Sequence, residues 1–364
     1  MLESEHKYMS PRYLIGSVVF LCAGIFAVMY ALYGHVPVPT LQAGVNILAS
    51  LSDATTTNSI LQSGPSVIAV GDIMLGRQVE NDMDRYGDSY PFAHIDDFMK
   101  NSDGVIANLE GPVVENHVVT PSMSLHFEFD TRMPAVIKSH NITVVNLANN
   151  HTYDDDGAYG FDQTVKYLDQ AGVMHAGNPF KIGDEYVLHT TIKNKKFIFV
   201  GFNITHPDFD FVAAHAFVQK IFKEKQSDEF MIAMVHGGEE YSLHSNATQE
   251  NFDRGLVDGG VDLVLAHHPH VVEEVEKYKN KLIFYSLGNF IFDQYFSQDV
   301  QDELAVNITF NKDSTHYELV PILSTNSQPA VMDDAHKKAF LLSLAERCDP
   351  SIQEEIRRGS IDIN

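Results

Sequence analysis

Seven short apolar segments lie between residues 66 and 288, and together they limit this chain to a small number of fold classes. Most of them end in polar or charged residues. Runs of this kind are typical of strands that are covered on both faces. The segments are SVIAVGD (66–72), GVIANLE (104–110), ITVVNLA (142–148), KFIFVGF (196–202), FMIAMVH (230–236), VDLVLAHH (261–268) and KLIFYSLG (281–288).

Two segments between these runs, residues 158–172 and 246–260, have helical spacing, and each ends at a glycine. Strands that alternate with helices predict an α/β fold. The runs 303–310 and 316–323 have no helix between them, so we expect them to add antiparallel strands to a mixed sheet. Residues 326–364 are expected to form a C-terminal helical appendix.

An uncharged apolar segment near the N-terminus, residues 13–34, predicts a membrane anchor. A helix of this length, at about 1.5 Å per residue, spans about 30 Å of hydrocarbon. A cleaved signal peptide is the alternative, but this segment is longer than a usual signal sequence core. We therefore expect a short cytoplasmic N-terminus (1–12), a single transmembrane helix (13–34) and a tether (35–65) rich in Ser, Thr and Ala.

The orientation of this anchor follows from its flanking charges. Lys7 and Arg12 precede the apolar segment, whereas no Lys or Arg follows it until Arg77. By the positive-inside rule, the expected location is the cell membrane, with one span and an extracytoplasmic C-terminal domain.

Charge and cysteine content exclude several classes of protein. The chain has 25 Lys and Arg against 49 Asp and Glu, a net charge of −24, which excludes nucleic acid as a partner because phosphate binding requires a basic surface. The only cysteines, Cys22 and Cys348, cannot build a Cys-rich zinc site. Any metal site must therefore use nitrogen and oxygen ligands.

Ligand-type side chains occur at the ends of five of the predicted strands. Because ligands of open α/β sheets collect beyond the carboxyl ends of strands, we expect these side chains to meet at one edge of one sheet. Carboxylates, amides and imidazoles together suit Zn²⁺, Mn²⁺ or Fe²⁺, and a bridging carboxylate would allow two ions to bind. The segments are Gly71-Asp72, Asn108-Leu109-Glu110-Gly111, Asn149-Asn150-His151, His236-Gly237-Gly238-Glu239 and His267-His268-Pro269-His270.

Seven ordered motifs resemble those of the bacterial CapA, or poly-γ-glutamate capsule-synthesis, family. The resemblance covers about residues 66–325 and implies a fold similar to the calcineurin-like metallophosphoesterases, a four-layer αββα sandwich of mixed sheets with a dinuclear metal site. The motifs are GDIMLGR (71–77), NLEGPV (108–113), NLANNHTYDDDGAYGF (146–161), AGNP (176–179), VHGGEEY (235–241), LVLAHHPHVV (263–272) and YSLGNFIFDQ (285–294).

The phosphoesterase pattern implies a role for each matching residue. Asp72, Glu110, Asn150, His236, His268 and His270 would be metal ligands, and His151 would be the proton donor. Two positions depart from the pattern: Met74 stands where a histidine ligand is usual, and Glu110 stands where an aspartate usually bridges the metals. A thioether is a poor ligand for a hard cation, so whether one ion or two bind stays open.

Two functional hypotheses follow from the motifs. The first is a membrane-tethered, metal-dependent hydrolase in which Asp154 orients His151, and Arg77 and Asn289 contact an anionic polymer or phosphoester substrate. The second is a non-catalytic metal-binding component of a capsule assembly or export complex, with synthase or export subunits as partners. A phosphodiesterase unrelated to capsule is a further alternative. No P-loop or Gly-x-Ser-x-Gly motif is present.

Overall fold

The computed structural model describes residues 64–155 and 157–364, whose strands form two mixed sheets. The expected N-terminal segment, transmembrane helix and nearly all of the tether lie outside these residues. Among the described helices, none combines the length and the apolar character needed to span a bilayer.

The first sheet has nine strands in the order β14-β13-β12-β1-β2-β3-β4, with β11 beside β1 and β15 beside β13. The strands β1 to β4 are parallel, whereas β12, β13, β14 and β15 run antiparallel to their neighbours. The bounds are β1 (Ser66–Ile73), β2 (Val105–Leu109), β3 (Ile142–Asn146), β4 (Met174–Ala176), β11 (Asn289–Ile291), β12 (Asp302–Phe310), β13 (Thr315–Thr325), β14 (Gln328–Val331) and β15 (Ser360–Ile363).

The second sheet has six strands in the order β5-β6-β7-β8-β10-β9, and its four central strands are parallel. Strands β5 and β9 close its two edges in antiparallel pairs. The bounds are β5 (Leu188–Ile192), β6 (Lys195–Asn203), β7 (Glu229–His236), β8 (Leu263–His267), β9 (Val275–Tyr278) and β10 (Lys281–Phe284).

The apolar runs are continuous because both faces of each sheet are buried. In β1, Val67 and Ala69 belong to the core between the two sheets, whereas Ile68 and Val70 belong to a separate core on the outer face. In β6, Phe197 packs between the sheets and Ile198 packs on the other face, against helices. Successive side chains of a strand point to opposite faces, so both alternating sets of side chains in the middle of these strands are apolar.

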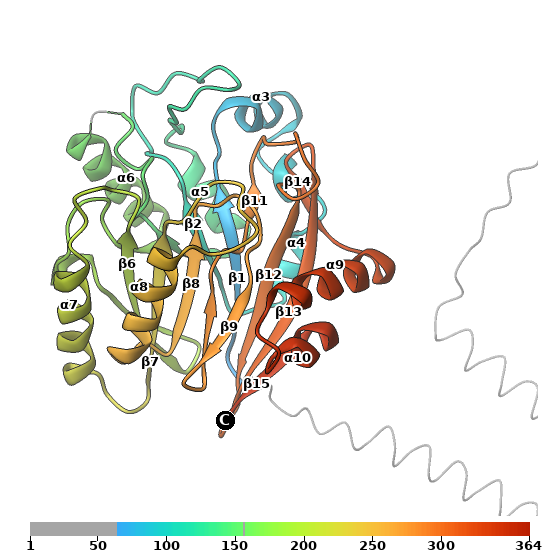
Figure 1. Ribbon diagram of the computed structural model, residues 1–364. Helices are drawn as coiled ribbons and strands as arrows, with labels where there is room; N and C mark the ends of the chain where they lie inside the picture. Colours follow the sequence, from blue (N-terminus) through green and yellow to red (C-terminus); the bar gives the residue numbers. More distant parts are fainter. Residues whose placement is uncertain (1–63, 156) are drawn as a thin grey trace, which may run out of the picture. The chain divides into compact units, whose positions relative to one another are not determined.

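Helices cover the outer faces of both sheets (Figure 1). The outer core of the first sheet includes side chains from α3 to α6, and that of the second includes side chains from α7 and α8. The layers are therefore helices, sheet, sheet and helices. The bounds are α3 (Arg77–Tyr86), α4 (Asp96–Lys100), α5 (Met133–Ser139), α6 (Ala158–Ala171), α7 (Phe211–Glu224) and α8 (Ala247–Asp258), with 3₁₀ turns η1 (Tyr90–Phe92) and η2 (Asp184–Tyr186).

The α/β class with mixed sheets is confirmed, and so are both helices predicted from spacing. Helix α6 ends at Gly172, which adopts the left-handed conformation (φ 70°) that glycine accommodates without steric cost. Helix α8 begins with a capping box, in which the side chains of Asn246 and Gln249 each accept a backbone N–H bond from the other residue.

The segment 326–364, expected to be helical, contains two helices and also two strands. Helices α9 (Asp334–Arg347) and α10 (Gln353–Arg358) contribute Leu341, Leu344 and Ile356 to the core between the sheets. Strands β14 and β15 both pair with β13, so this segment extends the first sheet and its core.

Candidate metal centre

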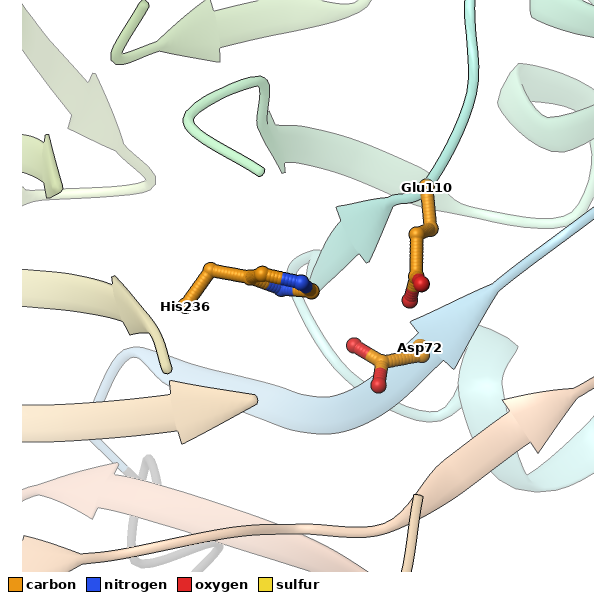
Figure 2. A group of neighbouring side chains, drawn as sticks. All are labelled: Asp72, Glu110 and His236. Carbon is orange, nitrogen blue, oxygen red and sulfur yellow. The ribbon is translucent and has the colours of Figure 1, made fainter. Parts of the chain in front are cut away.

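Asp72, Glu110 and His236 come together where β1, β2 and β7 end (Figure 2). One ligand atom from each lies within 4.8 Å of the other two, and all three residues are fully buried. Because β7 belongs to the second sheet, the prediction that the polar strand ends meet at one edge of one sheet is wrong. These three residues instead lie at the ends of parallel strands from two stacked sheets, at the same end of the fold.

A close approach between β1 and the segment before β11 fixes the backbone of Asp72. Gly71 packs so tightly that a Cβ atom there would lie 2.0 Å from the carbonyl oxygen of Gly288. The Asp72 N–H donates to that same carbonyl (3.1 Å). Only glycine at position 71 permits this contact, which is the physical reason for Gly-Asp at the end of this strand.

The Asp72 carboxylate is held by two donors. Its Oδ1 accepts from Asn108 Nδ2 at 2.8 Å, and its Oδ2 accepts from the backbone N–H of His268 at 3.3 Å. Burial nevertheless raises the pKa of Asp72 to about 7, so it is half-protonated near neutral pH in the absence of a cation.

Glu110 has two carboxylate oxygens that are buried and have no hydrogen-bond partner among the described residues. Two basic atoms lie just beyond hydrogen-bond distance of its Oε1, His151 Nε2 at 3.8 Å and His270 Nε2 at 3.9 Å. Burial, reinforced by the charge of Asp72, raises the pKa of Glu110 well above its ordinary value. An unpartnered buried carboxylate beside a second carboxylate requires either a proton or a cation. This donor set therefore fits a divalent metal ion.

A ladder of side-chain amides orients the ligands around this carboxylate pair. Asn108 Oδ1 accepts from Asn146 Nδ2 (3.0 Å) and from Asn149 Nδ2 (3.2 Å), which turns Asn108 Nδ2 toward Asp72 and to within 3.2 Å of His236 Nδ1. From the sequence, Asn108 was expected only as part of a strand-end motif. Its central position depends on the pairing of β1, β2 and β3, which no local pattern specifies.

Asn150 and His236, both predicted as metal ligands, contact each other. His236 Nε2 lies 2.7 Å from Asn150 Oδ1. Burial lowers the pKa of His236 well below its ordinary value, so the imidazole is neutral, as a metal ligand must be.

His268 and His270 follow β8 and reach the same site, although the backbone between them is not extended. Their φ angles are +102° and +59°, in the region that side chains other than glycine rarely adopt. The ring of His268 lies 4.8 Å from that of His236, and 6.1 Å from that of His270. Burial lowers their pKa values to about 4 and about 3, so both rings are neutral at pH 7. The buried Nδ1 of His268 has no partner among the described residues.

His151 occupies the open side of the cluster, next to Asp154. Its Nδ1 lies 2.6 Å from Asp154 Oδ2, and its ring stacks on Phe127 with the centroids 4.0 Å apart. Asp154 therefore fixes the ring so that Nε2 faces Glu110. Phe127, whose backbone N–H also donates to Asp154 (2.9 Å), was not identified from the sequence.

Arg77 and Asn289, the predicted substrate-binding residues, both contact protein groups. Arg77 is 5% exposed, so it is not a solvated surface charge. Its guanidinium forms an ion pair with Asp293 and donates to the carbonyl of Ser124 (2.8 Å). Asn289 is buried, and its Oδ1 lies 2.9 Å from His270 Nδ1, so it orients that ring. Contact with a substrate stays a prediction for both residues.

Met74 is the first residue after β1, and its side chain is fully buried. It belongs to the outer core of the first sheet, and its Sδ accepts the N–H of Gly76 (3.2 Å). The structure therefore gives the thioether a packing role.

Comparison with known families places these residues in context. The model of the family described as "Bacterial capsule synthesis protein PGA_cap" matches residues 66–294. This chain belongs to that capsule synthesis family. The resemblance expected from the seven motifs is thereby confirmed.

Two relatives carry names from the same family. The chain is 29% identical over 287 residues to the capsule biosynthesis protein CapA of Bacillus anthracis, which covers 74% of this chain and 70% of that protein. It is also 29% identical over 311 residues to the PGA biosynthesis protein CapA of Bacillus subtilis, with 81% of each chain covered.

Among solved structures, a hypothetical protein from Thermus thermophilus is similar at a TM-score of 0.43, with 17% identity over 73% of this chain and 96% of the other. Purple acid phosphatase PPD1 from yellow lupin is similar at a TM-score of 0.32, with 13% identity over 56% of this chain and 48% of the other.

The range matched by the capsule synthesis family contains every candidate residue, from Asp72 to Asn289, as well as Asp293. Strands β12 to β15 and helices α9 and α10 follow the matched range. The family match therefore coincides with the part of the described chain that builds the centre.

Proposed function

We propose that this protein acts in poly-γ-glutamate capsule synthesis as a metal-dependent hydrolase. The observation that carries the proposal is Glu110, whose two buried oxygens have no hydrogen-bond partner in the described part of the chain and lie beside Asp72 and His236. Asp72, Glu110, Asn150, His236, His268 and His270 would hold one or two divalent ions (Mn²⁺, Zn²⁺ or Fe²⁺). When bound, such an ion supplies an activated water and stabilises developing negative charge.

The protein's own contribution to hydrolysis would be proton transfer at His151. Asp154 accepts the Nδ1–H of His151, so the imidazolium form of the ring would give up its second proton, the one on Nε2, to the leaving group and become neutral; Nε2 faces the carboxylate cluster. Phe127 packs against the ring and limits its rotation. A positioned general acid of this kind typically contributes about 10²- to 10⁴-fold to the rate.

A metal analysis and an activity assay test this proposal. We would purify the chain, measure bound metal by elemental analysis, and assay generic phosphodiester and γ-glutamyl substrates. His151→Ala should keep the metal and lose activity. The control is His175→Ala, which removes a partly exposed ion pair between His175 of β4 and an aspartate of α6 and should change neither metal content nor activity. Stoichiometric metal with an activity indifferent to His151→Ala would refute the proton-donor role.

A non-catalytic role in polymer assembly is the second candidate. The state of Arg77 favours this role. Arg77 is a basic side chain that contacts Phe127 beside the centre, and its charge is already neutralised by Asp293. With the charge of Arg77 neutralised by Asp293, a carboxylate would bind through the metal. The test is the double variant His268→Ala, His270→Ala in a capsule-forming host. Loss of capsule in this variant, together with no detectable hydrolysis by the wild-type protein, would favour the non-catalytic role. A change in polymer length in the variant would favour hydrolysis.

The proposed location is the outer side of the cell membrane, with residues 13–34 as the single span and capsule synthase or export subunits as partners. The uncharged composition of residues 13–34 and the absence of Lys and Arg between them and Arg77 support this proposal. Deletion of residues 1–34 should move the protein from the membrane fraction to the soluble fraction.

A further inference from the structure

A long loop between β2 and α5, residues 110–132, lies next to the candidate centre. Its two limbs pair near their bases, where Phe129 N donates to Pro112 O (2.8 Å) and Val114 N donates to Phe129 O (3.1 Å). The side chain of Phe127 on the second limb stacks on His151. The position of this loop therefore determines the surroundings of the proposed proton donor.

Three side chains tie both limbs of this loop to helix α3. His117, on the first limb, places Nε2 2.7 Å from Glu80 Oε1 of α3 and Nδ1 3.8 Å from Asp130 Oδ2 of the second limb. One ligand atom from each of the three residues lies within 4.8 Å of the other two. An imidazole and two carboxylates from three separate segments are a donor set that divalent cations bind.

Glu80 has an unsatisfied oxygen in this cluster. The residue is fully buried, and its Oε2 has no hydrogen-bond partner among the described residues, although Oε1 of the same carboxylate contacts His117. A buried carboxylate oxygen without a donor is costly, and a cation would satisfy it.

The charge balance around the cluster also favours a cation. Asp84, Asp88 and Asp130 all pair with a single guanidinium, that of Arg132. With Glu80, four carboxylates face one arginine and one histidine, so negative charge remains in excess even when His117 is protonated. A divalent ion would offset most of this excess.

We propose that Glu80, His117 and Asp130 form a divalent-cation site that fastens the loop of residues 110–132 to α3. Ions that accept mixed nitrogen and oxygen ligands, such as Zn²⁺ or Mn²⁺, fit this donor set. The site shares no residue with the Asp72–Glu110–His236 centre, and it acts on that centre through the position of Phe127.

The test is zinc titration of the full metal-depleted chain by calorimetry, with elemental analysis after desalting. His117→Gln and Asp130→Asn should each lose one equivalent of zinc, or bind it at least about tenfold more weakly, relative to the wild type. His175→Gln is the matched control, because it removes a His–Asp pair that has no third ligand within the described residues. The second variant guards against misfolding, since the Asp130 side chain is 28% exposed.

The same titration separates this site from the proposed hydrolytic centre. His236→Gln should remove zinc from that centre and leave the equivalent at His117. Hydrogen exchange in residues 112–132 should slow on zinc addition in the wild type and in His236→Gln, but not in His117→Gln. Zinc stoichiometry and affinity that are unchanged in both His117→Gln and Asp130→Asn would overturn the proposal.

Discussion

Nε2 of His236 lies 2.7 Å from Oδ1 of Asn150, and this contact joins the six-stranded sheet to the nine-stranded sheet at the candidate centre. The two residues are 86 positions apart in the chain. Both are candidate ligands, so a cation between them would replace one hydrogen bond with two coordinate bonds. Metal occupancy should therefore stabilise the packing of the two sheets.

Metal binding at this centre should tighten as the pH rises. Burial raises the pKa of Asp72 to about 7, and burial together with the charge of Asp72 raises the pKa of Glu110 well above its ordinary value, so a cation must displace protons to reach the carboxylates. Below pH 7, each displaced proton weakens the apparent affinity by about tenfold per pH unit. Calorimetric titration with Mn²⁺ at pH 6, 7 and 8 measures this dependence. Equal affinity at pH 6 and pH 8 would contradict it.

Asp154→Asn should lower the rate of the proposed hydrolysis without releasing metal. An amide at this position cannot stabilise a protonated His151, and the 2.6 Å contact to Nδ1 would weaken. We expect a loss of about 10- to 100-fold in kcat, smaller than that of His151→Ala. The pH profile of kcat should change shape in Asp154→Asn but not in Asp169→Asn, which alters the His175 pair. Identical profiles in all three proteins would count against an orienting role for Asp154.

Asp293→Asn should destabilise the fold strongly. Both members of the Arg77–Asp293 ion pair are buried, with side chains 7% and 3% exposed, so the substitution leaves a buried cation without its partner. The expected loss is about 3 kcal/mol of unfolding free energy, measured by urea denaturation. Lys166→Ala, which breaks an exposed pair with Glu115, should cost less than about 1 kcal/mol. Similar costs for the two variants would mean that Arg77 does not depend on Asp293.

Glu273→Gln should flatten the pH dependence of stability. Burial raises the pKa of Glu273 from 4.5 to about 9, so the folded state keeps a proton that the unfolded state loses in this window. The contribution of Glu273 to the free energy of unfolding is therefore fully present below pH 4.5. It is lost as the pH rises toward 9, at up to about 1.4 kcal/mol per pH unit. Glutamine mimics the protonated acid and can accept the bond from Gln249 Nε2, which is 2.8 Å long.

Urea denaturation of both proteins between pH 4 and pH 9 checks the expectation for Glu273. The difference between Glu273→Gln and the wild type should be small at pH 4 and should grow in favour of the variant toward pH 9. A constant difference across this range would show that Glu273 is ionised in the folded protein.

Strands and helix ends were predictable from sequence because each depends on neighbours along the chain. The apolar run at 66–72 matches β1 since both faces of that strand are buried, and α6 ends where Gly172 adopts φ 70°. The pairing of His151 with Asp154 was also predictable, because three positions separate the two residues.

Tertiary structure alone decided which sheets carry the candidate ligands and what the remaining polar side chains contact. The pairing of β1 with β2 and of β2 with β3 places Asn108 at the middle of the amide ladder. Arg77 pairs with Asp293, which lies 216 positions away in the chain. These contacts arise from strand register and from the packing of one sheet on the other, which burial of apolar faces drives without regard to distance along the chain. The sequence by itself determined which chemical groups are available; the stacking of two sheets determined which of them share a site.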